Sequence, residues 1–163
     1  MNNAESSPLE ILYQDESLIA INKPSGLLVH KSPIDKHETT FALQMVRDQI
    51  GQYVYPIHRL DKPTSGVLLF ALNAQMAKTM SLLFRESQVA KEYIAIVRGF
   101  TEEASLIDYP LKQMLDTKEQ KQQGITKEAQ EAQTRFHRLA TVELPYPVSR
   151  YPVARYSLVK LYP

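Results

Sequence analysis

The apolar run Gly66–Leu72 most constrains what this chain can fold into, because it contains no charged side chain and must be buried. Such a run is typical of a strand that is covered on both faces. Directly before it lies a polar loop, His58–Ser65. Pro63 in this loop fixes its own φ and favours an extended Lys62. The sequence therefore predicts a stiff loop that holds Asp61 at the end of a buried strand.

Asp61 has two possible interpretations at this stage. A catalytic carboxylate needs a reproducible position, because its oxygens must lie close to the atom that they attack. A carboxylate in a proline-containing loop can also do no more than cap a turn between two strands. The segment Asp61–Gly66 alone favours the turn interpretation, so the surrounding motifs decide between the two.

Two further blocks accompany the loop. Ile19–His30 contains the residues Asn-Lys-Pro-Ser-Gly, and Lys91–Gly99 begins with Lys-Glu-Tyr. Together with His58–Gly66 they resemble the motifs of the RluA/RsuA-type pseudouridine synthases, and the resemblance runs from about Leu9 to the C-terminus. It implies an α+β fold with a mixed, mainly antiparallel central sheet flanked by helices, which agrees with the order of the elements expected here.

Eight strands and two helices are expected along the chain. A helix ending near Ile50 can begin at Thr39 or Thr40 and close at Gly51, and a second helix can begin at Asn73. The segment Lys112–Gln133 is either a loop or a solvated helix. The expected strands span residues 9–13, 18–22, 53–57, 66–72, 91–97, 105–109, 134–144 and 153–161.

Length and composition limit the classes of protein that fit. The chain has 163 residues, of which 44% are hydrophobic, as expected for one globular domain over residues 9–163 after a disordered N-terminal segment, residues 1–8. It contains no cysteine, which excludes disulfides and thiolate ligands and fits a cytoplasmic location. No apolar run reaches the roughly 20 residues of a membrane helix, and no secretory signal is evident.

The net charge of +1 gives no support for nucleic-acid binding by itself. The basic residues are unevenly distributed, because residues 111–163 contain nine basic and five acidic side chains. A basic face in the last third of the chain would produce this imbalance, but a solvated surface often produces it as well.

The resemblance implies roles for individual residues. Asp61 is expected to be the catalytic carboxylate and Tyr93 to pack against the uracil and transfer a proton, although Tyr93 can also be an ordinary strand aromatic. Arg59 is expected to contact RNA and to help hold the target nucleotide out of the helix, unless it only forms an ion pair. Further expected RNA contacts are His58, Lys23, Lys31, Lys62 and Lys91.

The reaction implied is the isomerisation of uridine to pseudouridine, which needs no cofactor, metal or nucleotide. The four histidines, at positions 30, 37, 58 and 137, do not have the spacing of zinc ligands. Val46–Gln52 and Arg150–Tyr156 are most similar to a branch of the family that modifies uridine 65 of tRNA. The expected partner is therefore tRNA, and the enzyme is expected to be a monomer. A ribosomal RNA substrate, or an inactive RNA-binding module, remains open.

One departure from the family pattern concerns the end of the chain. The family has a third motif, Thr-Gly-Arg-x-His-Gln-Leu/Ile-Arg, whose last arginine pairs with the catalytic aspartate, and this sequence stops at Pro163. Without that arginine, a buried Asp61 would have a raised pKa. The expectation is a domain truncated before the third motif, with little or no activity by itself.

Overall fold

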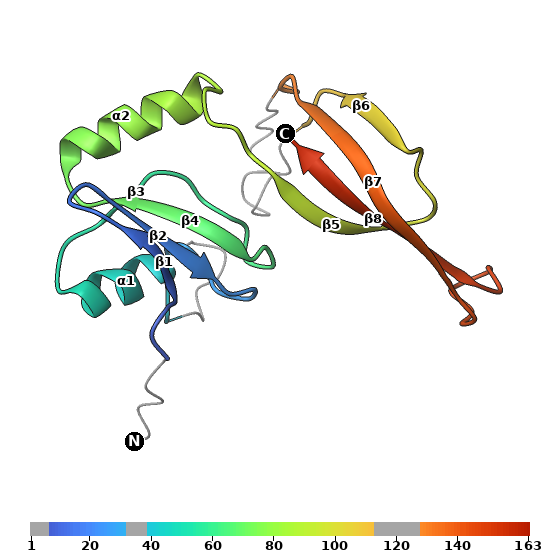
Figure 1. The fold of residues 1–163 in the computed structure, drawn as a ribbon, viewed down its shortest axis with the longest axis horizontal. Coiled ribbons are helices and arrows are strands. Elements are labelled where there is room, and N and C mark those ends of the chain that lie inside the picture. The colour runs from blue at the N-terminus through green and yellow to red at the C-terminus, as the bar shows by residue number, and fades with distance from the viewer. Residues whose placement is uncertain (1–6, 32–38, 113–127) are drawn as a thin grey trace, which may run out of the picture. The chain divides into compact units, whose positions relative to one another are not determined.

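The computed structural model describes residues 7–31, 39–112 and 128–163, and contacts divide the chain into two compact units, Met1–Val89 and Ala90–Pro163. Each unit contains one four-stranded antiparallel sheet, and both helices belong to the first unit (Figure 1). The α+β prediction is confirmed, with the strands divided between two sheets. Within the described ranges, no helix is long and apolar enough to cross a membrane.

The sheet of the first unit has the strand order β1-β2-β4-β3. The predicted hairpin between the first two strands is confirmed, since β1 and β2 pair antiparallel. β4 lies inside the sheet, where β2 and β3 pair with it from either side. The strands span Ile11–Gln14 (β1), Leu18–Lys23 (β2), Tyr55–Pro56 (β3) and Gly66–Ala71 (β4).

Burial of β4 follows the prediction along most of the strand. Leu68 and Phe70 are fully buried and, with Ile19 and Ile21 of β2, form the core of the unit. Val67 is 57% exposed, which contradicts burial on both faces at the end of β4 that adjoins the loop. The strand is therefore anchored in the core, while its first two residues stay at least partly accessible.

The first helix, α1 (Ala42–Ile50), has its N-cap one or two residues after the predicted positions. Phe41 is the N-cap residue and no side chain caps the helix, so neither Thr39 nor Thr40 has the predicted role. Instead, the first two helical amides donate to the carbonyls of residues 28 and 29, at 2.8 and 3.0 Å. These backbone bonds satisfy the donors that a side-chain cap would otherwise bind.

The second helix, α2 (Ala74–Arg85), has the predicted cap. The side chain of Asn73 accepts a hydrogen bond of 2.8 Å from the amide of Met76.

The C-cap of α1 is also as predicted, because Gly51 has a positive φ of 65°. Asparagine and glycine are effective at these places for local reasons that the sequence shows directly.

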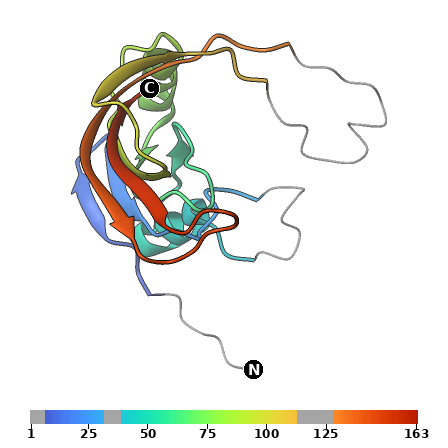
Figure 2. The ribbon, with the colours of Figure 1, turned by 90° about the vertical axis from the view of Figure 1, so that its right-hand side faces the viewer.

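The sheet of the second unit has the order β5-β8-β7-β6. All four predicted strands are found, with ends shifted by one or two residues. β7 and β8 form a long, curved hairpin (Figure 2). The strands span Tyr93–Arg98 (β5), Ala104–Asp108 (β6), Gln133–Leu144 (β7) and Ala154–Tyr162 (β8).

Two predictions fall largely outside the described residues. The expected disordered segment covers residues 1–8, of which 1–6 are not described, and the undecided segment Lys112–Gln133 includes the undescribed residues 113–127. On either side of that gap, Leu111 and Gln130 exchange two backbone hydrogen bonds of 2.8 and 3.0 Å.

Ser157 organises the buried centre of β8. Its hydroxyl donates to the carbonyl of Gly99 at 2.9 Å and accepts from the amide of Thr101 at 3.0 Å. Gly99 has a positive φ of 92°, which a glycine adopts without strain. The turn that follows β5 is therefore fixed to β8 by one fully buried serine.

Candidate active site

The loop that carries Asp61 is anchored at two points in the core of the first unit. Ile57 and Leu60 are buried, whereas Arg59 and Asp61 are exposed. The amide of Thr64 donates to the Asp61 carbonyl at 3.0 Å and closes a turn. The anchors and the turn together present the carboxylate of Asp61 to solvent from a defined backbone.

The first motif binds to this loop through its backbone and one hydroxyl. The amide of Gly26 donates to the carbonyl of Lys62 at 2.8 Å, and the hydroxyl of Ser25 donates to the carbonyl of Pro63 at 2.7 Å. Lys23 and Gly66 are opposite each other in the ladder of β2 and β4. Two segments that are distant in the sequence thus form one structural element.

Lys23 completes this connection from within. Its side chain is fully buried, and its Nζ donates to the carbonyls of Pro24 at 3.0 Å, Leu27 at 2.7 Å and Lys62 at 3.3 Å. Desolvation lowers the pKa of Lys23, and the nearby negative charge of Asp61 opposes this effect. Burial contradicts the predicted phosphate contact. Lys23 instead holds the loop and places a positive charge near Asp61.

His58 connects the loop to β4 and α2. Its Nε2 accepts a hydrogen bond of 3.1 Å from the amide of Leu69. Its ring stacks on Phe84, with centroids 4.7 Å apart and an angle of 13° between the planes. These contacts position His58 against β4 and α2, and its expected RNA contact stays a prediction.

The remaining candidates are more accessible. Arg59 is exposed and Lys62 is half-buried in the same loop, and Lys31 is exposed. Tyr93 is half-buried at the start of β5, and Lys91 lies just before it; both belong to the second unit. Five candidate residues are therefore brought together around the loop: Lys23, His58, Arg59, Asp61 and Lys62.

The chemistry available at this loop is that of an exposed carboxylate near cationic groups. A side chain placed in this way can attack an electrophilic carbon or remove a proton, and Arg59 can bind a phosphate. In the part of the chain that the structure describes, no three His, Asp or Glu side chains form a group that could hold a metal ion.

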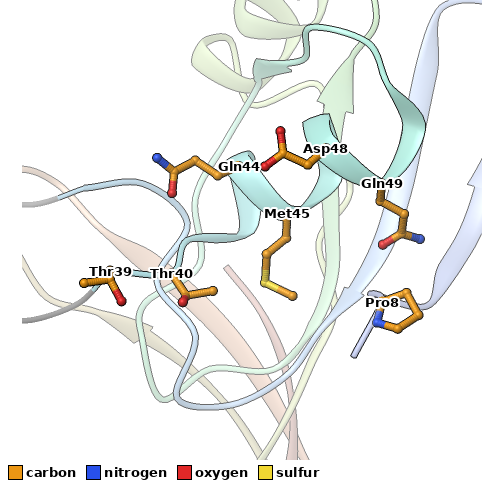
Figure 3. Close-up of a pocket in the computed structure, with 7 residues that line it drawn as sticks. All are labelled: Pro8, Thr39, Thr40, Gln44, Met45, Asp48 and Gln49. Carbon is orange, nitrogen blue, oxygen red and sulfur yellow. The ribbon is translucent and has the colours of Figure 1, made fainter. Parts of the chain in front are cut away.

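A separate cleft of about 390 Å³ lies beside α1 (Figure 3). Gln49, on its wall, bonds to the backbone of Leu9 in both directions, at 2.8 and 2.9 Å. Asp48, another wall residue, is paired with Arg47 at 2.8 Å. Both polar groups thus have structural partners. The cleft is lined by Pro8, Thr39, Thr40, Gln44, Met45, Asp48 and Gln49.

Comparison with known sequences gives a consistent result. The RNA pseudouridylate synthase family matches residues 17–163. The chain is 58% identical to tRNA pseudouridine synthase C of Pasteurella multocida over 95% of its own length and 64% of the relative. For the same enzyme of Haemophilus influenzae the identity is 57%, over 95% and 65% of the two chains. The chain thus spans a little under two thirds of the length of these relatives.

Solved structures give the same fold. Human RNA Pseudouridylate Synthase Domain Containing 4 superposes with a TM-score of 0.65 at 29% identity, over 94% of this chain and 58% of that one. Human RNA Pseudouridylate Synthase Domain Containing 1 superposes with a TM-score of 0.67 at 23% identity, over 99% and 62%, and supports the fold alone.

Proposed function

Because the chain belongs to the RNA pseudouridylate synthase family, we propose that it provides the catalytic aspartate of an enzyme that isomerises a uridine of tRNA to pseudouridine. The observation that carries the proposal is the exposed Asp61 on a loop that Lys23, Ser25 and Gly26 hold by hydrogen bonds. The substrate is inferred from relatives named tRNA pseudouridine synthase C. Within tRNA we propose uridine 65 as the target.

The reaction breaks the bond between N1 of uracil and C1′ of the ribose, and forms a bond between C5 and C1′. The proton on C5 is lost and N1 gains one, so the conversion is balanced without an electron acceptor. Asp61 can begin it by attacking C1′, by adding to C6, or by removing a sugar proton. In each case the ionised carboxylate is the reacting group, and the positive charge of Lys23 lies near it.

Other side chains would hold the substrate. Tyr93 would stack on the uracil and transfer a proton through its hydroxyl. Arg59, Lys62 and Lys91 would bind phosphates around the target nucleotide. These contacts offset the cost of extruding one base from the helix, which is about 2–4 kcal/mol. The enzyme would act as a monomer in the cytoplasm, where a chain without cysteine has no disulfide to maintain.

A pseudouridine map of tRNA and ribosomal RNA tests the proposal in cells that lack the gene. The full-length protein should restore one tRNA site. Asp61→Asn should not restore it, because an amide cannot act as a nucleophile or base. Asp48→Asn is the matched control, since this exposed acid pairs with Arg47 and should restore the site fully. Restoration by Asp61→Asn, or a site in ribosomal RNA alone, would refute the corresponding part of the proposal.

A further inference from the structure

A second cleft lies within the second unit, and the family resemblance implies no role for the residues that line it. It has a volume of about 340 Å³, at the small end of the roughly 300–1,000 Å³ range of ligand pockets. The end of β5 and the start of β8, with the residues just before β8, form its walls. Its lining consists of Arg98, Gly99, Tyr151, Pro152, Val153 and Arg155.

Two guanidinium groups lie over the ring of Tyr151, an exposed residue that lines this cleft. The guanidinium carbon of Arg98 lies 5.9 Å from the centroid of the Tyr151 ring, and that of Arg150 lies 5.2 Å from it. Arg150 also donates to the Tyr151 hydroxyl at 3.1 Å. Tyr151 is 50% exposed as a residue, so part of its surface is available to a ligand. Tyr151 thus combines an accessible aromatic surface with two neighbouring cations.

A third arginine lines the cleft, but a carboxylate pairs with it. Arg155 lies over the ring of Phe100, with its guanidinium carbon 5.3 Å from the ring centroid. It is neutralised by Glu143, whose carboxylate accepts from Nε at 2.6 Å. Among the described residues, no ion pair joins Arg98 or Arg150 to a carboxylate. The positive charges of Arg98 and Arg150 are therefore not used in ion pairs among the described residues.

The backbone of the cleft is rigid on the β5 side. Ser157 holds the carbonyl of Gly99 and the amide of Thr101, and the amide of Gly99 donates to the carbonyl of Arg155 at 2.7 Å. Arg98 is opposite Tyr156 in the ladder of β5 and β8. Arg98 thus extends from a backbone that is fixed before any ligand binds, which lowers the entropic cost of binding.

We propose that this cleft binds one nucleotide of the RNA substrate, as a contact additional to the Asp61 loop. Arg98 and Arg150 bind its phosphate, and Tyr151 stacks on its base. Two cations that no described carboxylate pairs with, beside an exposed aromatic residue, favour RNA, because each nucleotide offers both a phosphate and a flat base. The identity of the RNA rests on the proposed function, whereas the binding site rests on the cleft.

The test uses full-length protein with Asp61→Asn, so that tRNA binds without turnover. In this background, Arg98→Gln with Arg150→Gln should weaken tRNA binding about tenfold or more and reduce the salt slope by about two. The matched control is Lys112→Gln with Arg135→Gln, which removes two exposed cations of the same unit and should leave affinity within about twofold. Equal effects of the two double variants would overturn the proposal.

Tyr151 separates stacking from charge. Tyr151→Phe should retain tRNA affinity, whereas Tyr151→Ala should lose about fivefold or more, because only the former keeps the ring. Thermal unfolding of each variant checks that the fold is intact. Polyglutamate serves as a probe for an acidic peptide ligand. If the Arg98→Gln, Arg150→Gln variant binds polyglutamate more weakly but tRNA with unchanged affinity, the assignment of the cleft to RNA is overturned. A full rate of pseudouridine formation by Asp61→Asn would refute the proposed function without affecting these binding results.

Discussion

Lys23 shows how a single residue can determine the geometry of the candidate site. An ammonium group carries three hydrogens, and the three carbonyls of Pro24, Leu27 and Lys62 are placed to accept them. Burying a charged group without such partners costs several kcal/mol, roughly 3–5 kcal/mol when a partner is removed. The favourable charge of Asp61 adds to these bonds. Lys23 therefore stabilises the loop that carries Asp61.

Replacing Lys23 with methionine should destabilise the protein by about 3 kcal/mol, because methionine retains the volume but leaves the three carbonyls without their donor. The midpoint of urea unfolding, followed by circular dichroism, measures the change. Lys78→Met is the control, since Lys78 is exposed on α2 and should shift the midpoint little. Equal midpoints for the two variants would show that the three hydrogen bonds do not stabilise the fold.

The sequence predicted where Asp61 lies but not what Lys23 does. Pro63 and the apolar run after Gly66 are local signals, and they locate the loop correctly. A lysine before a proline is more often a surface residue. Its burial depends on the carbonyl of Lys62, which comes from a segment 39 residues away in the sequence. No local pattern contains that information.

At the scale of elements, the hairpin of β1 and β2 depends on one acidic turn residue. Asp15 accepts hydrogen bonds of 2.7 Å from the Tyr13 hydroxyl and from the amides of Ser17 and Leu18. These bonds, that of Tyr13 above all, lower the pKa of Asp15 below its usual 3.8. The turn is therefore stabilised above pH 3.8 and loses this contribution as the pH falls through the lowered pKa.

Tyr13→Phe should move the titration midpoint of Asp15 upward, toward 3.8. The shift should be partial, because the two amide hydrogen bonds remain. Carbon-13 NMR of the Asp15 carboxyl group measures the midpoint. As a control, Tyr53→Phe alters an exposed ring that contacts Tyr55, and it should leave the midpoint unchanged. An Asp15 midpoint that does not respond to Tyr13→Phe would contradict the assigned cause.

The two helices show which element boundaries can be predicted. Asn73 caps α2 through its own side chain, so its sequence signal is sufficient. The start of α1 is set by the carbonyls of residues 28 and 29, and Phe41 pairs with Leu28 in an isolated parallel bridge. Thr39 and Thr40 have the chemistry of a cap but are not used. Tertiary contacts decided this boundary, and they are not visible in a local pattern.

At the scale of the whole molecule, the candidate residues are divided between two units. Asp61 and Arg59 belong to the first, and Tyr93 and the arginines of the cleft belong to the second. The pattern of apolar residues predicted the strands but not their division into two sheets, because pairing partners lie far apart in sequence. If both units bind RNA, the affinity of the intact protein should depend on cations of each.

Binding of tRNA by the full-length protein should therefore weaken steeply as salt increases, because phosphate contacts release bound counterions. Arg59→Gln should reduce the slope of log affinity against log salt by about one. Arg47→Gln should leave the slope unchanged, since Arg47 pairs with Asp48. Filter binding over a range of potassium chloride measures both slopes. A flat response in the wild-type protein would contradict binding through phosphates.

The central claim is that Asp61 begins the bond exchange, and loss of the hydrogen at C5 reports it most directly. The measurement is release of tritium to water from tRNA labelled at C5 of uridine, catalysed by the full-length protein. The wild-type protein and Asp48→Asn should release tritium, and Asp61→Asn should release none above background. Release by Asp61→Asn at the wild-type rate would contradict a catalytic role for Asp61.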